Sequence, residues 1–201
     1  ISMYGASDGA TGEHYIDEND FHMKFYANPN ISGETRAISV IGGIHPQTEN
    51  TILGNHFEFE NMFNQSARSC AINVTDGDYN NLSVSGNNFY HTHNQLSLRG
   101  ETGIRLTGST GSGNYASGNI FYDRPTPLSR AYDFGLYVAD FDNTNYEYNI
   151  IRESNTGFLF NGTNENTNMR CNDMIGGNEL LKLDFAIIGQ QGATDINGNV
   201  T

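Results

Sequence analysis

Positively charged residues are scarce in this sequence: 10 Lys and Arg stand against 23 Asp and Glu, and the formal net charge is −13. A surface this acidic repels phosphate backbones and anionic lipid headgroups, so nucleic acid is not an expected partner. No run approaches the ~18 apolar residues of a membrane span, so membrane insertion is not expected either. The two cysteines are too few for a disulfide-rich scaffold, and nothing in their spacing predicts a zinc site or another cofactor.

The composition also argues against a helical protein. Asn outnumbers even the 23 Gly, and both residues are poor helix formers that favour turns and left-handed backbone. Disorder is not expected, because 12 Phe and 11 Tyr are spread along the chain. With 201 residues the chain is long enough for one sizeable domain or one continuous solenoid. We therefore expect a single folded unit built from strands and turns.

A turn motif recurs along the chain. In each of the three clear copies, two apolar or small residues are followed by Gly-Asn, then by any residue, and then by Phe. Three degenerate copies follow these. The aligned asparagines are Asn55, Asn87, Asn119, Asn149, Asn172 and Asn199, at intervals of 32, 32, 30, 23 and 27 residues. Asn tolerates left-handed backbone, and its amide is both donor and acceptor. The motif therefore predicts a ladder in which the asparagines of successive repeats bond one another.

A short strand pattern precedes each turn motif. Every copy begins with a small residue, an apolar residue and then any residue, and most copies end on a second apolar residue. This alternation is the period-two pattern of a strand with one buried face. The copies begin at Ala37, Ala71, Gly103, Gly135, Gly157 and Ala186. The spacing between the strand copy and the aligned asparagine stays similar through all six repeats. Each repeat can bury its apolar face by stacking on the next.

These two repeated elements predict the fold class. We expect an all-β chain that forms a single-stranded parallel β-helix of about six coils with an asparagine ladder, over residues 37–201. Residues 1–36 lack a clear copy of either element. They are predicted to be an N-terminal cap or a degenerate coil, because the open end of a β-helix exposes strand edges that must be covered.

The last repeats resemble a known group of proteins. Residues 156–164, 169–174 and 188–192 read Thr-Gly-Phe-Leu-Phe-Asn-Gly-Thr-Asn, Met-Arg-Cys-Asn-Asp-Met and Ile-Gly-Gln-Gln-Gly. They resemble the β-helix repeat proteins that Bacteroidota secrete through the type IX system. The resemblance implies a right-handed helix and a location outside the cell or on its surface. It also implies a longer parent polypeptide with a C-terminal sorting domain, of which this chain would be a fragment.

Four acidic residues are candidates for chemistry. Asp76 and Asp78 form one Asp-x-Asp pair, and Asp140 and Asp142 form another. Each pair follows a predicted core strand, so the pairs could line one side of the solenoid as catalytic groups or, for the second pair, as calcium ligands. The alternative is that these carboxylates are solvated and simply form turns, since no further carboxylate recurs at regular spacing.

Two histidines and three charged residues form a second group of candidates. His91 and His93 alternate along one segment, so both imidazoles could share a face as a general base or a metal pair. The alternative is two exposed polar residues, because no nearby Cys or Glu completes a site. Glu101, Arg105 and Arg124 could join them in a carbohydrate groove.

The aromatic residues divide into two sets by their place in the repeat. Phe57, Phe89 and Phe121 occupy the same position of the turn motif and are predicted to stack in the core. Tyr90 and Tyr122 each follow one of these phenylalanines, so they should point outward. Outward aromatic side chains on successive coils could contact glycans, or they could be ordinary surface tyrosines.

Two classes of function remain open. The first is an extracellular or cell-surface structural or adhesive module, which could assemble with copies of itself, end to end or laterally, or contact surface glycans. The second is a carbohydrate-active β-helix, either a polysaccharide lyase or an epimerase, or the receptor-binding spike of a phage. Residue patterns similar to those of pectate lyases or polygalacturonase-like hydrolases are not found, and the sequence has no Arg-x-Lys step.

The repeat also predicts the state of the two cysteines. Cys70 opens the strand of the second coil, and Cys171 takes the place that Gly holds before the aligned Asn in other coils. Three coils at about 4.8 Å each separate them by roughly 14 Å, beyond the ~7 Å between Cα atoms that a disulfide allows. We expect two free thiols, both buried.

Overall fold

The structure is a computed structural model that describes residues 1–4, 14–26, 34–42, 50–62, 68–91, 101–122, 134–152, 154–176 and 179–188. The regular structure within these residues is β-strand, in three parallel sheets that we call A, B and C. Sheet A contains β1 (Ser2–Tyr4), β4 (Glu34–Ile41), β7 (Arg68–Thr75), β10 (Glu101–Ser109), β13 (Phe134–Phe141), β16 (Thr156–Asn164) and β19 (Glu179–Ile188). Sheet B contains β2 (His14–Asp17), β5 (Asn50–Leu53), β8 (Ser83–Ser85), β11 (Asn114–Ser117), β14 (Thr144–Glu147) and β17 (Asn168–Arg170). Sheet C contains β3 (Asp20–Tyr26), β6 (His56–Met62), β9 (Asn88–His91), β12 (Ile120–Tyr122), β15 (Ile150–Arg152) and β18 (Asp173–Ile175).

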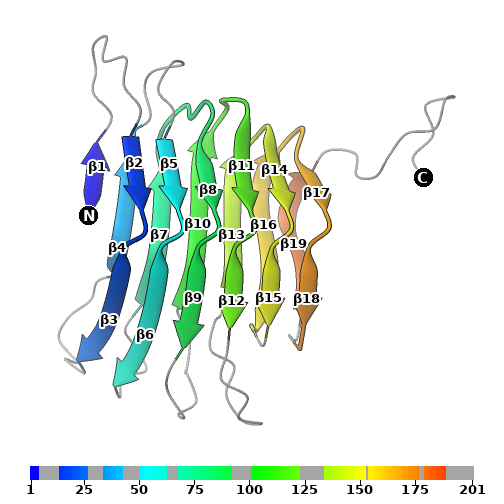
Figure 1. Ribbon diagram of the computed structural model, residues 1–201. Helices are drawn as coiled ribbons and strands as arrows, with labels where there is room; N and C mark the ends of the chain where they lie inside the picture. The colour runs from blue at the N-terminus through cyan, green and yellow to red at the C-terminus, as the bar shows by residue number, and fades with distance from the viewer. Residues whose placement is uncertain are drawn as a thin grey trace, which may run out of the picture.

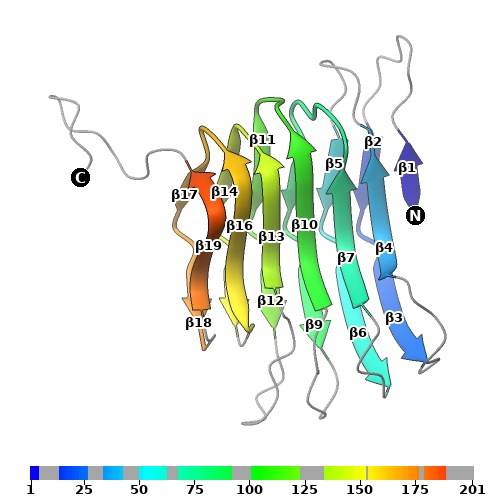
Figure 2. The ribbon, with the colours of Figure 1, turned by 180° about the vertical axis from the view of Figure 1, so that it is seen from behind.

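Each strand pairs in parallel with the strand three places further along the chain, so the chain passes through sheets A, B and C in turn. This is a parallel β-helix, as predicted, with six coils from β1 to β18 followed by β19 (Figure 1). The coils advance from left to right in Figure 1, with sheets B and C running downward on the near side. Figure 2 shows sheet A running upward on the other side, so the winding is right-handed.

The core is a set of apolar columns, one residue per coil, because the register of parallel pairing places equivalent residues above one another. In sheet A, Ile38, Ile72, Ile104, Leu136 and Phe158 follow one another in register. In sheet C the predicted phenylalanine stack is confirmed, with Phe57 and Phe89 at 5.0 Å and Phe89 and Phe121 at 4.4 Å between ring centroids. All three phenylalanines are completely buried.

In three coils the small residue of the repeated strand pattern is a glycine that makes room for a core side chain of sheet C. A Cβ placed on Gly103 would lie 2.2 Å from Cε1 of Phe121, which is too close for two carbon atoms. The small position of the repeated strand pattern is therefore a packing requirement. It lets the phenylalanine column of sheet C approach the backbone of sheet A.

The asparagine ladder is confirmed at the turn between sheets B and C. The backbone N–H and the Nδ2 of Asn119 both donate to Oδ1 of Asn149, at 3.1 and 3.0 Å. Nδ2 of Asn119 also donates to the carbonyl of Val84 in the preceding coil, at 2.8 Å. The same bonds run through Asn55, Asn87, Asn119, Asn149 and Asn172. Asn199, the sixth predicted member, lies outside the described residues.

The ladder begins one coil earlier than the sequence motif indicates. The backbone N–H and the Nδ2 of Asn19 donate to Oδ1 of Asn55, and Phe21 stacks on Phe57 at 4.9 Å. The strands β1, β2 and β3 pair in register with β4, β5 and β6, so these three strands belong to a first coil.

The residue before each ladder asparagine has left-handed backbone. Its φ is 52° at Glu18, 65° at Gly54, 62° at Gly86, 63° at Gly118, and 55° at both Tyr148 and Cys171. Three of the six coils therefore hold a residue other than glycine in a conformation that costs about 1–2 kcal/mol for L-residues. The conformation, and not the glycine, is the invariant feature of this turn.

The predicted position of the last strand copy is wrong. Leu181 and Leu183 pair with Phe158 and Phe160, so the copy begins at Leu180 and not at Ala186. The sequence suggested Ala186 because a small residue precedes two apolar ones there. β19 also contains an irregularity near Phe185, whose φ is 52°, and this shifts its second half against β16.

Both cysteines are free, as predicted, but only Cys70 is buried. Cys171 is exposed, so its predicted burial is wrong. The reason is its left-handed position in the turn, which directs the side chain away from the stack. Tyr148, which occupies the equivalent position one coil earlier, is likewise 58% exposed.

Candidate functional site

The outer face of sheet C carries a column of side chains that is continuous through six coils. Each member follows a core residue by one position, so alternation along the strand turns it outward. We call this the tyrosine column; its members are His22, Glu58, Tyr90, Tyr122, Arg152 and Ile175. Arg152 lies beside Tyr122 because the preceding residues, Ile151 and Phe121, are paired in register.

The two tyrosines at the centre of this column form an exposed aromatic pair. Tyr90 and Tyr122 are 37% and 38% exposed, and their ring centroids are 6.3 Å apart with planes tilted by 59°. The ring of His56 lies 6.4 Å from that of Tyr90 and extends the surface toward the N-terminal coils. Ile120 and Ile150, in register with each other in the neighbouring outward column, are partly buried beside the pair.

Polar and charged groups flank the aromatic pair on both sides. On the N-terminal side, Nδ1 of His22 lies 2.8 Å from Oε2 of Glu58. On the C-terminal side, Arg152 is exposed and makes no ion pair with any residue that the structure describes. The aromatic pair is thus flanked by the acceptor oxygens of Glu58 on one side and by up to five N–H donors of Arg152 on the other.

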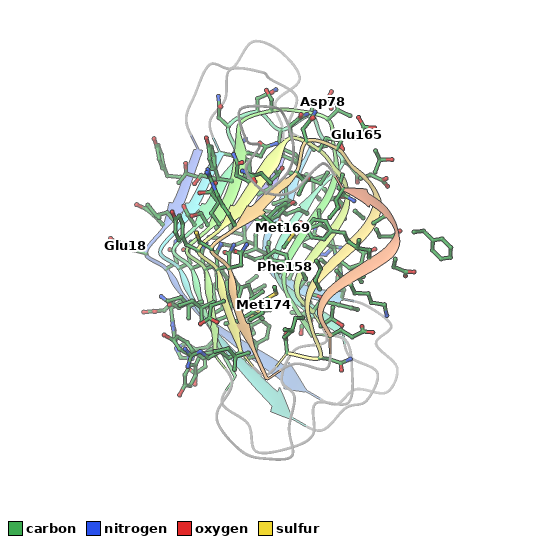
Figure 3. All side chains as sticks on the ribbon, turned by 90° about the vertical axis from the view of Figure 1, so that its right-hand side faces the viewer. Glu18, Asp78, Phe158, Glu165, Met169 and Met174 are labelled. Atoms are coloured by element: carbon green, nitrogen blue, oxygen red, sulfur yellow. The ribbon has the colours of Figure 1, made fainter. Side chains whose placement is uncertain are left out.

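The four aspartates singled out in the sequence lie at the edge between sheets A and B, where three of them bond the next coil. Oδ1 of Asp78 accepts from Oγ1 of Thr110 at 2.6 Å. Oδ1 of Asp140 accepts from the backbone N–H of Thr163 at 2.8 Å, and Oδ1 of Asp142 accepts from that of Glu165 at 2.6 Å. Seen from the C-terminal end, Asp78 and Glu165 project onto this same edge from coils three steps apart, and Glu18 marks the edge between sheets B and C (Figure 3).

The same view shows Phe158, Met169 and Met174 pointing into the space that the three sheets enclose (Figure 3).

Asp76 is exposed at the same edge as Asp78 and has a φ of 57°. These positions explain why Asp recurs there: the residue tolerates left-handed backbone and its carboxylate accepts inter-coil hydrogen bonds.

The remaining candidates do not gather around these aspartates. His91 ends β9 at the far end of sheet C from the edge where Asp76 and Asp78 lie (Figure 1). His93 and Arg124 lie outside the described residues, as do the side chains of His91 and Glu101.

Arg105 belongs to an ion pair that the sequence did not reveal. From β10 it reaches across β7 to Glu34 on β4, with Nη1 at 2.6 Å from Oε2 and Nη2 at 2.6 Å from Oε1. Nε of Arg36 also donates to Oε2 of Glu34, at 3.0 Å, and the guanidinium of Arg105 lies 5.8 Å from the ring centroid of Tyr137. The two residues are 71 positions apart in sequence and lie two coils apart in the stack. The pair can therefore be predicted only when the number of residues in both coils is known.

Burial and these charges together set the pKa values of Glu34 and of the nearby Cys70. Burial raises the pKa of Glu34, but the hydrogen bonds and charges of Arg105 and then Arg36 outweigh burial and hold the pKa below its ordinary value. Burial raises the pKa of the nearby Cys70 thiol to about 12. That thiol is therefore protonated and unreactive at neutral pH.

Within the described residues, no group of three or more His, Cys, Asp and Glu side chains is arranged to hold a metal ion. The described part of the chain also has no helix with the length and hydrophobicity that a membrane crossing requires. Comparison with protein-family models, curated proteins and solved structures finds no match for the chain.

Proposed function

We propose that this chain is a structural or adhesive module of an extracellular or cell-surface protein. The observation that carries the proposal is the uninterrupted ladder from Asn19 to Asn172, which ties six coils into one rod. Five coil steps at about 4.8 Å separate its ends by about 24 Å. A rod of this kind holds whatever lies on its faces at a fixed spacing, which suits a spacer or an adhesive surface.

The chemistry of the polar residues supports the same proposal. Three of the four candidate aspartates accept hydrogen bonds from the next coil, and Arg105 is paired with Glu34. Groups that hold coils together in the ground state are poorly placed to bind or protonate a substrate. The separation of His91 at the end of β9 from Asp76 and Asp78 beyond β7 argues against a single site made of these three residues.

The proposed location rests on the sequence. The last repeats resemble the β-helix proteins that Bacteroidota secrete through the type IX system. The residues that carry this resemblance include Cys171 and Asn172, and Asn172 is a member of the ladder. The excess of carboxylates, with a net charge of −13, keeps such a rod soluble and separate from anionic surfaces.

A turnover assay tests the proposal against the lyase and epimerase alternatives. The purified chain is incubated with acidic and neutral polysaccharides, and unsaturated products, reducing ends and epimerised sugars are measured. We expect no product from the unaltered chain. Product formation that disappears in the His91→Ala or Asp78→Ala variant, with the thermal unfolding midpoint unchanged, would overturn the structural proposal.

A further inference from the structure

We propose that the tyrosine column of sheet C is a glycan-binding surface, on which a neutral polysaccharide lies parallel to the axis of the β-helix. The inference rests on the proposed adhesive function and names its partner. Two sugar rings would pack on Tyr90 and Tyr122, with a twist between the two sugars that follows the 59° tilt of the tyrosine rings. Their hydroxyl groups would bond Arg152 on one side and Glu58 on the other.

The aromatic pair provides the stacking surface. A pyranose ring has a face of C–H groups, and such a face packs on the electron-rich face of an aromatic ring. Tyr90 and Tyr122 are paired in register on adjacent strands and are more than one third exposed. Because two χ angles fix a tyrosine, and the sheet fixes its backbone, little conformational entropy is lost when a sugar binds.

The spacing of the coils matches a repeating ligand. Neighbouring strands of a sheet lie about 4.8 Å apart. An extended chain of β-linked pyranose residues advances by a similar distance per residue, so consecutive sugars would meet consecutive coils. A polymer with this repeat can contact several members of the column at once, and multiple contacts raise affinity without a deep pocket.

The polar groups of the column are suited to hydroxyl groups. The guanidinium of Arg152 has donors and no ion-pair partner among the described residues, and Glu58 has acceptor capacity beyond its contact with His22. The net charge of −13 repels an anionic polymer at long range, which favours a neutral glycan over an acidic one.

Binding is tested with neutral β-linked hexasaccharides of glucose and of mannose, and with polygalacturonate as the acidic arm, by isothermal titration calorimetry. We expect at least one neutral hexasaccharide to bind. Its affinity should fall by about tenfold or more in the double variant Tyr90→Ala/Tyr122→Ala, because two stacking contacts are lost. The matched control is Tyr115→Ala, which removes a tyrosine that is 46% exposed on sheet B and should leave the affinity unchanged.

Each remaining outcome has a defined meaning, provided that thermal unfolding shows every variant to be folded. Absence of binding, unchanged binding by the double variant, or binding of polygalacturonate alone would overturn the glycan surface and leave the structural module intact. An equal loss in Tyr115→Ala would overturn the assignment to sheet C. Conversion of a bound hexasaccharide to product would overturn the proposed function while leaving the surface in place.

Discussion

The two edges of sheet B hold the coils together in opposite ways. At the edge toward sheet C, identical asparagines recur, four of them completely buried, and each donates to the Oδ1 of the next. At the edge toward sheet A, side chains of different types bond the neighbouring coil. Asp78, Asp140 and Asp142 are accessible to solvent and accept from the following coil, whereas the buried Asn114 accepts from the preceding one. One edge repeats a residue, whereas the other repeats only an interaction.

The difference follows from burial. A buried amide must satisfy both its donor and its acceptor, and asparagine meets that demand in each coil with the same geometry. An exposed turn can complete its hydrogen bonds with water, so Asp, Asn or Ser serves there and the residue type varies. Stability should therefore depend far more on the buried edge than on the exposed one.

The largest expected effect is that of Asn119→Ala in the middle of the ladder. The change removes the acceptor of the Asn87 backbone N–H and the side-chain donor to the Val84 carbonyl, both of them buried. Two orphaned groups should lower the free energy of unfolding by about 3 kcal/mol. Denaturant unfolding measures the change.

The same substitution at Asn172 serves as the matched control. Asn172 is only partly buried in the last coil of the described ladder, so water can replace its bonds. We expect a loss of about 1 kcal/mol. Equal losses at Asn119 and Asn172 would contradict the role assigned to burial.

The next effect concerns sheet A, where the ion pair of Glu34 and Arg105 joins coils that asparagine amides join at the ladder. Glu34→Gln weakens the contact with Arg105 and should destabilise the chain by about 1–2 kcal/mol at pH 7. Because the folded-state pKa of Glu34 is lowered, its contribution is present above the unfolded pKa and is lost as the pH falls through the folded value. The stability difference between the parent chain and Glu34→Gln should therefore shrink between pH 6 and about pH 3. A difference that stays constant over this range would show that the charge of Glu34 contributes nothing.

The contrast between the edges also explains how far the sequence predicts the fold. The buried ladder is visible as a repeated Gly-Asn, and it fixed the register of five coils. Asn19 escaped notice because Glu18 replaces the glycine and no clear strand copy precedes it; Asn149 and Asn172 also lack the glycine, but each follows a clear strand copy. The final strand was misplaced because Leu180 replaces the small residue, which is a packing requirement that a residue pattern only approximates.

The candidate site was predictable only in part, for a related reason. Tyr90 and Tyr122 follow aligned phenylalanines, so alternation along the strand predicts that they share a face. The other contributors come from coils of different length. Arg152 and Glu58 join the column, and Arg105 meets Glu34, only after the number of residues in each coil is known.

A smaller effect is expected at the left-handed position of the buried edge. Gly118 has a φ of 63°, and an added Cβ would meet no atom closer than 3.9 Å, so Gly118→Ala tests backbone strain alone. We expect a loss of about 1 kcal/mol in the free energy of unfolding. Gly118→Asn should cost less, because Asn adopts left-handed backbone more readily. An alanine variant as stable as the parent would contradict the strain argument.

At the exposed edge, Asp142→Ala should reduce stability by about 0.5–1 kcal/mol, because the backbone N–H of Glu165 loses its acceptor but can bond water. Asp142→Asn keeps the Oδ1 acceptor and should be close to neutral. Thermal unfolding of the two variants separates the hydrogen bond from the charge. A large loss in both would mean that the carboxylate charge matters and that this edge is not merely a weaker copy of the ladder.

A stabilising effect is expected at Tyr148, where the protein carries the strain that glycine avoids in three other coils. Its φ is 55° and its side chain is 58% exposed, so Tyr148→Gly removes strain at the cost of little packing. Relief of about 1–2 kcal/mol of strain is offset by the greater freedom of glycine in the unfolded chain, about 0.4–1 kcal/mol. The net result should be a stabilisation between zero and about 1.5 kcal/mol, opposite in sign to Gly118→Ala. Paired thermal melts of the two variants measure this sign reversal, and a destabilised Tyr148→Gly would show that the tyrosine ring has a packing role that outweighs its backbone strain.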